Sequence, residues 1–377
     1  TNKLERKSMK RRHLLISVGA LFLLFALGAE FIANDTAIIY EQDGHWKCGA
    51  CMEWPGKIQP PTPDNARTIL QPFIRFDANA LSKESLYLAP PFSSEEAGTH
   101  WLGTDSQSRD VLAGIIYGTR YALLIGFISV FFALMVGTIL GGMAAYYGDH
   151  KLRISPAANL FFLISIGAFS YASYYQLTHI LVGSMAITLV FILTLTLGQS
   201  ENGISWPVNQ WVTKGIELFD SLPALFVLLA FAATIQNWNI WTLSLLIAFF
   251  RWPTFARLTR SEMTPWANSA WIKALRDLEM PDLWIVRTQL LNLVIVPISI
   301  HAAFALAGAV SIEATLTFLG FGLGVETQSW GRLLSDARQY FQAWWLVVFP
   351  GLFLFIFLWW TNQMARYIQR KTQHLNP

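Results

Sequence analysis

The side chains that could support catalysis or bind a metal ion are few and scattered along the chain. The seven histidines form no HExxH pair, and the sequence contains neither a GxSxG nucleophile motif nor a GxxxxGK(S/T) phosphate loop. The only two cysteines, Cys48 and Cys51, are separated by two residues and could form a local disulfide on an oxidising side of a membrane. Redox chemistry, or a metal site shared with His45, is the alternative. We therefore expect no catalytic centre, no metal and no nucleotide bound by this chain itself.

Composition indicates an integral membrane protein. Hydrophobic residues make up 54% of the 377 residues and charged residues only 14%, with a mean hydropathy of +0.40. A soluble domain carries about 25% charged residues. The net charge of +3 argues against a nucleic-acid footprint. The expected fold class is an all-α polytopic helical bundle.

About eight apolar stretches are long enough to cross a bilayer. They cover residues 14–33, 119–147, 157–176, 179–198, 216–236, 239–256, 292–312 and 343–365. The two at 157–198 are joined by a very short polar break and are predicted to form a hairpin. In the span at 119–147, Gly137 and Gly141 form a GxxxG pair that lets a second helix approach closely.

This layout divides the chain into four parts. Residues 1–33 form a basic cytoplasmic N-terminus and a first transmembrane helix, for which a cleaved signal peptide is the alternative. Residues 34–118 form a periplasmic segment, 119–365 the transmembrane domain, and 366–377 a cytoplasmic tail. Lysine and arginine are more numerous in the parts placed inside, in agreement with the positive-inside rule.

Residues 260–290 form the most polar long stretch of the second half, between two predicted spans. One face of a helix here is apolar and consists of Trp271, Ala274, Leu275 and Leu278. The other side is charged and consists of Lys273, Arg276 and Asp277. Pro281 predicts a helix end near Met280, and Asp282 can cap a second short helix. We interpret the stretch as two short helices with a sharp bend, exposed on the cytoplasmic side as a docking element.

Charged residues within apolar stretches are candidates for function, although structural roles are the simpler expectation. Glu217 and Asp220 could pair with Arg257 or Lys214, and Arg251 could reach the inner interface. Glu313, at the expected start of an outer segment, could pair with Arg332 or Arg338. His301 lies mid-span, where a helix-packing hydrogen bond is favoured over a substrate contact. Trp344, Trp345, Trp359 and Trp360 are expected in interfacial belts.

Three groups of motifs resemble dipeptide/oligopeptide ABC-transporter permeases, specifically their C-type subunit. The first is His100-Trp101-Leu102-Gly103-Thr104-Asp105, followed by Arg109-Asp110 and Tyr117-Gly118-Thr119-Arg120. The second is Phe219-Asp220-Ser221-Leu222-Pro223, followed by Trp252-Pro253 and Arg260. The third runs from Ile312-Glu313-Ala314 through Phe318, Gly320 and Gly322 to Ser329-Trp330-Gly331. Phe31-Ile32-Ala33-Asn34-Asp35 is similar to the branch that includes microcin C and oligopeptide importers.

The resemblance implies a type I importer permease, with a six-span core to which the 157–198 hairpin is added. It implies that the loop at 260–290 carries the family's EAA motif and docks on an ATP-binding subunit. The docking residues would be Trp271, Lys273, Ala274, Leu275, Arg276, Leu278 and Glu279. The chain departs from the family pattern at three positions: Glu279 replaces a glycine, Leu275 replaces an alanine, and Leu291-Asn292 replaces Leu-Pro.

The partners that the resemblance implies are a second permease subunit in a heterodimer, two ATP-binding subunits or a fused ATPase, and a periplasmic solute-binding protein. ATP and Mg²⁺ would bind in the ATPase partners. The expected location is a bacterial inner membrane, in contact with lipid, with both termini cytoplasmic. Two alternatives stay open: a self-contained channel or secondary carrier, and a permease for a non-peptide solute such as a nickel chelate.

Overall fold

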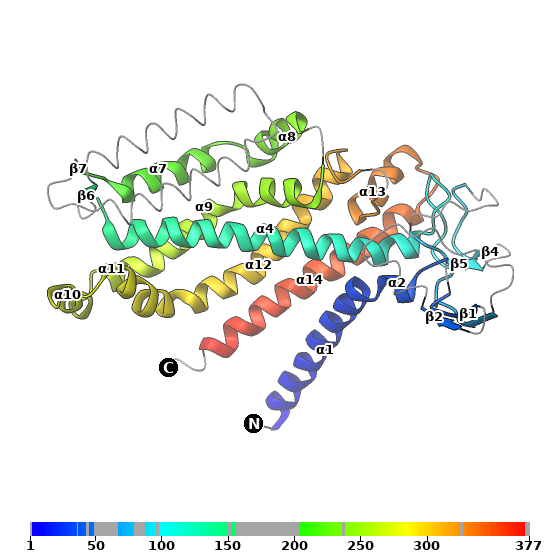
Figure 1. Ribbon diagram of the computed structural model, residues 1–377, viewed down its shortest axis with the longest axis horizontal. Coiled ribbons are helices and arrows are strands. Elements are labelled where there is room, and N and C mark those ends of the chain that lie inside the picture. The colour runs from blue at the N-terminus through cyan, green and yellow to red at the C-terminus, as the bar shows by residue number, and fades with distance from the viewer. Residues whose placement is uncertain are drawn as a thin grey trace. The chain divides into compact units, whose positions relative to one another are not determined.

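Helices form most of the computed structural model (Figure 1). The structure describes residues 2–35, 37–42, 45–48, 67–78, 87–94, 98–149, 153–154, 204–235, 238–324 and 327–373. The chain divides into two compact units. The first comprises Thr1–Phe127, Trp238–Ile240 and Leu306–Met364, and the second comprises Ile128–Asn237, Trp241–Ala305 and Ala365–Pro377. The hairpin predicted at 157–198 lies outside the described residues.

The first unit combines long helices with small antiparallel sheets. Its N-terminal elements are α1 (Asn2–Leu27), α2 (Ala29–Ile32), β1 (Ile39–Gln42), β2 (His45–Lys47), β3 (Arg67–Leu70), β4 (Ser93–Ser94) and β5 (Thr99–His100). The strand orders are β2-β1-β3 and β4-β5. It also contains the start of α4 (Val111–Tyr147), the end of α12 (Leu291–Phe318), α13 (Trp330–Gln339) and most of α14 (Trp345–Gln373).

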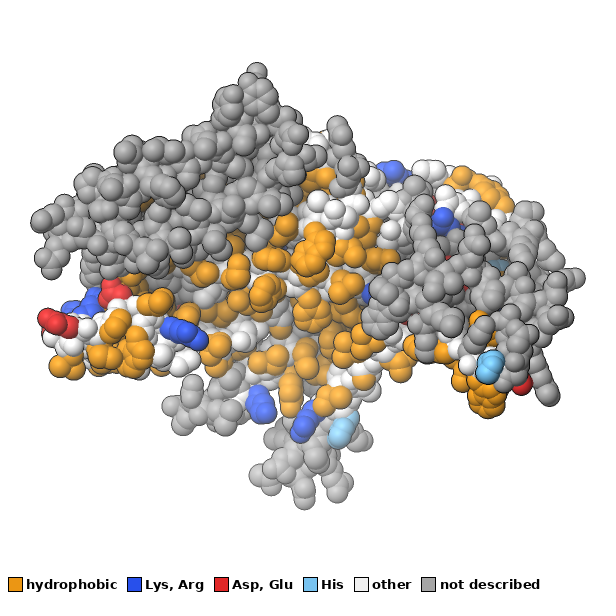
Figure 2. All heavy atoms as spheres, in the orientation of Figure 1, with side chains coloured by type: hydrophobic (Ala, Val, Ile, Leu, Met, Phe, Trp, Pro, Cys, Tyr) orange, Lys and Arg blue, Asp and Glu red, His pale blue; other side chains and the backbone are white. Residues whose placement is uncertain are grey.

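The described part of the second unit consists of helices and one short strand pair, β6 (Arg153–Ile154) with β7 (Ile204–Ser205). Its helices are α7 (Val208–Ser221), α8 (Ala224–Thr234), α9 (Ile240–Ala267), α10 (Ala270–Asp277) and α11 (Asp282–Trp284). A π-helical turn, η2 (Ile285–Leu290), joins α11 to α12. In this unit, Figure 2 shows hydrophobic side chains along the helices and charged ones at the end that carries α10.

Three helical stretches of the described residues are long and apolar enough to cross a membrane: Val111–Tyr147, Asp282–Phe318 and Trp345–Lys371. The bent pair α7 and α8 would be a fourth if it counts as one span. These stretches agree with the predicted spans at 119–147, 292–312 and 343–365. The total of eight spans stays a prediction.

The span predicted at 216–236 is not one continuous helix. The chain breaks between α7 and α8, whose axes differ by 89°. Pro223 has no backbone N–H to donate into a helix, and it disfavours helical geometry at the residue before it. Leu222 is accordingly extended, with φ −94° and ψ 136°. The predicted span included Pro223, although proline is a strong helix-breaking signal.

A close helix crossing in the second unit explains the GxxxG pair of α4. A Cβ atom added to Gly137 would lie 2.6 Å from the Trp252 carbonyl oxygen of α9. One added to Gly141 would collide with the backbone of Ala256, one turn further along α9. The prediction that these glycines permit a close approach of two helices is confirmed.

Candidate functional site

Helix α10 is anchored to the second unit through one buried residue. Ile272 is fully buried, and the partly buried Leu275 and Met280 pack against the same hydrophobic cluster. The cluster gathers side chains from α4, α9, η2 and α12: Ala145, Tyr146, Met263, Ala267, Ile285, Leu290, Val294 and Ile298. Because this cluster is close-packed, a movement of α10 would displace the adjoining ends of α4, α9 and α12 (Figure 1).

The opposite side of α10 is exposed and carries apolar side chains. Trp271 is 39% exposed and Leu278 is 73% exposed, while Ala274 lies between them on the exposed surface. Their spacing of three and four residues places them on one helical face. Three of the four residues predicted for the apolar docking face therefore share an accessible surface. Leu275, the fourth, faces the interior instead.

Arg276 binds inward and is not part of a free charged face. Its guanidinium carbon lies 4.2 Å from the centre of the Tyr146 ring, at the end of α4. Its Nε donates to the Tyr146 hydroxyl at 3.2 Å, and one terminal nitrogen donates to the Tyr146 carbonyl at 3.3 Å. Lys273 and Asp277, the other two charged residues predicted there, are exposed.

Tyr146 also joins α4 to α11, because its hydroxyl donates to a carboxylate oxygen of Asp282. The prediction that Asp282 caps a helix by its side chain is wrong. Pro281 occupies the N-cap position without a side-chain bond, and Asp282 is the first residue of α11. Sequence reasoning missed Tyr146, since nothing in the local pattern links the end of one span to a loop 130 residues later.

Glu279 has a left-handed backbone, with a φ of 57°. Its N–H donates to the Arg276 carbonyl at 2.8 Å, and the next N–H, of Met280, donates to the Leu275 carbonyl at 3.2 Å. These two bonds end the helix, and the left-handed position in such a helix end is normally a glycine. The bend after α10 therefore keeps the geometry that a glycine would allow, although the residue is a glutamate.

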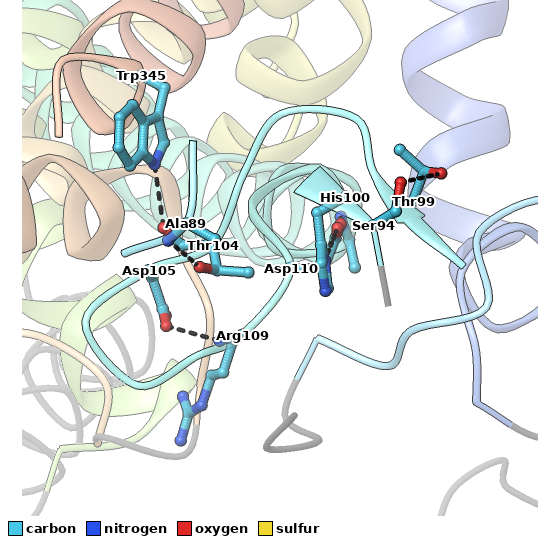
Figure 3. Close-up of polar contacts among 10 residues, drawn as sticks. Ala89, Ser94, Thr99, His100, Thr104, Asp105, Arg109, Asp110 and Trp345 are labelled. Atoms are coloured by element: carbon cyan, nitrogen blue, oxygen red, sulfur yellow. Dashed lines mark hydrogen bonds and ion pairs between the residues drawn. The ribbon is translucent and has the colours of Figure 1, made fainter. Parts of the chain in front are cut away.

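In the first unit, residues 100–110 form a connected hydrogen-bonding loop before α4 (Figure 3). Asp110 accepts the Ala113 N–H at 2.7 Å and thereby caps α4. Its second oxygen lies 2.8 Å from Nδ1 of the buried His100. Asp105 accepts the N–H groups of Gln107 and Arg109, each at 2.8 Å.

Asp105 is held in a buried turn, and burial raises the pKa of its carboxyl above the ordinary value. The backbone N–H groups that it accepts, and the charge of Arg109, act in the opposite direction. Burial also raises the pKa of Asp336 in α13. Gln328 donates to Asp105 at 3.3 Å, so the loop is tied to the segment just before α13.

Gly103 and Thr104 fit the same loop against α14. Gly103 has a φ of +82°, and a Cβ there would lie 2.6 Å from the Ala89 carbonyl oxygen. Thr104 accepts the Ala89 N–H through its hydroxyl at 2.7 Å, and its carbonyl accepts from the Trp345 indole at 3.0 Å (Figure 3). Trp345 is therefore buried within the protein, and the prediction that it lies in an interfacial belt is wrong.

The third motif group packs around the end of α12. Trp330 is fully buried and donates to the Ile115 carbonyl at 3.0 Å. A Cβ on Gly331 would lie 2.5 Å from the Ala314 carbonyl, and one on Gly322 would collide with the Thr317 side chain. Gly320 has a φ of +94° in the turn that ends the helix. Gly322 and Gly331 are thus needed for close packing, and Gly320 for the backbone conformation of the turn.

The predicted environment of Glu313 is wrong. Helix α12 continues to Phe318, so Glu313 is buried within it and does not start an outer segment. It accepts the Thr317 hydroxyl at 3.1 Å. The predicted partners bind elsewhere: Arg332 contacts Asp336 at 3.6 Å, and Arg338 lies over the Phe318 ring.

Other predictions concern single contacts. Asp220 forms the predicted ion pair with Arg257, with both side chains exposed. Arg251, which is predicted to reach the inner interface, is half-buried and has a bond of 3.5 Å to the Ala305 carbonyl. His301 packs edge-on against the Phe255 ring. Cys48 is disulfide-bonded, and Cys51 lies outside the described residues.

Comparison with known proteins places this arrangement in a family. Residues 191–374 match the model of the "binding-protein-dependent transport system inner membrane component". The chain is 24% identical over 359 residues to the inner membrane ABC transporter permease protein YejE of Escherichia coli (strain K12), which covers 91% of this chain and 87% of that protein. Over residues 191–374 the chain belongs to the binding-protein-dependent transport permeases.

Two further relatives of the permease align over shorter lengths. It is 26% identical to the dipeptide transport system permease protein DppC of Alkalihalophilus pseudofirmus, over 67% of this chain and 64% of that protein. It is 24% identical to the oligopeptide transport system permease protein OppC of Haemophilus influenzae, over 70% and 67%. The permease is thus a multi-pass inner-membrane transport component and not an enzyme.

Proposed function

We propose that the permease forms part of the transmembrane path of an ATP-binding-cassette importer for peptides or peptide-like solutes. The names of its relatives, which include dipeptide and oligopeptide permeases, support this solute class. The family description supports a partner that binds the solute. The second transmembrane subunit is a different permease chain, and ATP and Mg²⁺ bind to two ATPase subunits or to a fused ATPase.

The observation that carries the proposal is the two-sided character of α10. Trp271, Ala274 and Leu278 present an apolar exposed face, while Ile272 fixes the helix to the ends of α4, α9 and α12. A short helix that is apolar on both sides needs a second protein surface to cover the outer one. An ATPase subunit with a matching cleft is that surface.

Transport then follows from a two-state equilibrium. ATP closes the ATPase dimer, and α10 moves with it as a rigid body. The Ile272 cluster and the Arg276–Tyr146 contact transmit this movement to α4, α9 and α12. ATP changes the side from which the solute path is open only through its different affinity for the two states.

The proposed sidedness follows from the same helix. If α10 meets an ATPase, its end of the second unit is cytoplasmic, and the basic last turn of α14 with Arg370 and Lys371 agrees with a cytoplasmic C-terminus. The N-terminus, with six basic residues before the first apolar run, is placed on the same side.

The experiment introduces a charge on the exposed face of α10. Ala274→Glu and Leu278→Glu should abolish solute-stimulated ATP hydrolysis in the purified complex, because a carboxylate would be buried in the docking contact. Lys371→Glu, at the exposed end of α14, is the control and should leave the stimulation unchanged. Normal stimulation in both α10 variants would refute the docking role.

A further inference from the structure

Arg251 is a cation that has no carboxylate partner among the described residues of the second unit. Its side chain is half-buried on α9, and within the described residues its Nε makes no hydrogen bond. The single bond of a terminal nitrogen, to the Ala305 carbonyl, has a length of 3.5 Å. A guanidinium has five N–H donors, so the part of the chain that the structure describes leaves most of this donor capacity unused.

The sequence around Arg251 supplies no carboxylate that could fill this role. The stretches 111–148, 150–200, 221–261 and 283–312 contain neither aspartate nor glutamate. Among the described acidic residues of the second unit, Asp220 is already paired with Arg257, and Glu217, Glu262, Asp277 and Glu279 are exposed. A charge inside a membrane protein is costly without a partner, and such residues commonly mark a solute path.

Arg251 on α9 and His301 on α12 belong to the same contact between these two helices. Arg251 and Phe255 are one turn apart on α9, and His301 and Ala305 are one turn apart on α12. Arg251 bonds to Ala305, while Phe255 packs against His301 with ring centres 5.3 Å apart. The four residues therefore form one patch that combines a fixed cation, an imidazole and an aromatic edge.

The position of this patch along α12 favours the carboxylate of a transported solute over the phosphate of a lipid headgroup. Ala305 lies near the middle of α12, roughly 20 Å from either helix end at 1.5 Å per residue. The phosphate of a lipid headgroup lies at the membrane surface, far from such a position. A solute that crosses the membrane must pass this depth, and a peptide carries a carboxylate at its C-terminus.

We propose that Arg251, assisted by His301, forms a binding site for the carboxylate of the transported solute. The planar guanidinium can hold a carboxylate with two parallel hydrogen bonds. A neutral imidazole can donate one more. This inference rests on the proposed function and adds to it a chemical group that the path selects.

The test compares uptake of one peptide in two forms, with a free C-terminal carboxylate and with a C-terminal amide. The complete complex is reconstituted in proteoliposomes, with a peptide chosen so that the wild type imports both forms. The solute-binding protein is the same in every sample, so a change in the acid-to-amide ratio belongs to the permease. Arg251→Gln should lower uptake of the acid by about tenfold and leave the amide within about twofold.

Two further variants complete the design. Arg251→Lys keeps the charge but loses the planar fork, and should lower the acid-to-amide ratio by a smaller factor. Arg370→Gln removes an exposed arginine from the end of α14 and should leave the ratio unchanged. An unchanged ratio in both Arg251 variants would overturn the carboxylate site.

The outcomes separate this inference from the proposed function. If Arg251→Gln fails to co-purify with the second permease while Arg251→Lys assembles with an unchanged ratio, Arg251 pairs with the partner subunit and the inference is wrong. Failure of the wild-type complex to import any peptide would instead contradict the proposed solute class.

Discussion

The guanidinium carbon of Arg276 in α10 lies over the Tyr146 ring at the end of α4, 4.2 Å from the ring centre. The same tyrosine bonds to Asp282 at the start of α11. One side chain of a long helix thus holds both short helices of the loop. The pair gives α10 a polar connection to α4 in addition to the hydrophobic one through Ile272.

Tyr146→Phe should weaken coupling without disrupting the fold. The change removes the hydroxyl, and with it the bond from Arg276 Nε and the bond to Asp282, but keeps the aromatic ring under the guanidinium and the bond of Arg276 to the backbone carbonyl. Loss of these charge-assisted bonds should cost about 1–3 kcal/mol. We expect fewer solute molecules imported per ATP hydrolysed in proteoliposomes. An unchanged ratio of import to hydrolysis would show that Tyr146 has no part in coupling.

Glu279→Gly should stabilise the bend after α10. The left-handed backbone at this position, with φ 57°, strains any residue that carries a Cβ. Glycine should raise the free energy of unfolding by about 1 kcal/mol. Thermal unfolding in detergent measures the change. Glu279→Ala is the matched control and should show no gain, because alanine keeps the Cβ; equal gains in both would assign the effect to the lost charge.

Asp110→Ala should destabilise the first unit far more than Asp110→Asn. Alanine removes the cap of α4 and leaves the buried His100 without its carboxylate. The two losses together should cost about 2–4 kcal/mol. Asparagine can still accept the Ala113 N–H, so its cost should be smaller. Similar melting temperatures of the two variants in detergent would contradict this account.

The stability of the first unit should fall as pH rises from about 4. The pKa of Asp105 lies above its ordinary value of 3.8 in the folded protein because the carboxyl is buried. The folded state therefore holds the proton more tightly than the unfolded state, and ionisation reduces stability. Asp105→Asn should flatten this part of the pH profile of thermal unfolding. An equally steep fall in the variant would exclude Asp105 as its source.

The residue pattern was sufficient to predict helix type and loop form where local signals agree. The apolar spacing around Trp271 and the stop at Pro281 predicted the helix and bend of α10 correctly, because both depend on neighbours in sequence. The pair Gly137 and Gly141 predicted a close crossing, although the residues of α9 that it meets could not be known.

Asp220 and Arg257 pair as predicted, but three other predictions that depended on distant partners failed. Glu313 was paired with the nearest cations of the following segment, but the continuing helix buries it beside Thr317. Arg276 is predicted on the charged side of the helix and among the docking residues, but it binds Tyr146, which lies 130 residues earlier. Trp345 suggested an interfacial belt, yet its indole reaches the Thr104 carbonyl across 241 residues. Such contacts are set by tertiary packing, which local pattern does not encode.

Site-specific photo-crosslinking from position 278 tests the docking of α10 most directly. A photoreactive residue in place of the exposed Leu278 should form an adduct with the ATP-binding subunit when the whole complex is irradiated. The same residue in place of Phe226, which is 71% exposed on α8, should form no adduct with that subunit. Absence of the ATPase adduct from position 278, or an equal yield from position 226, would contradict the account.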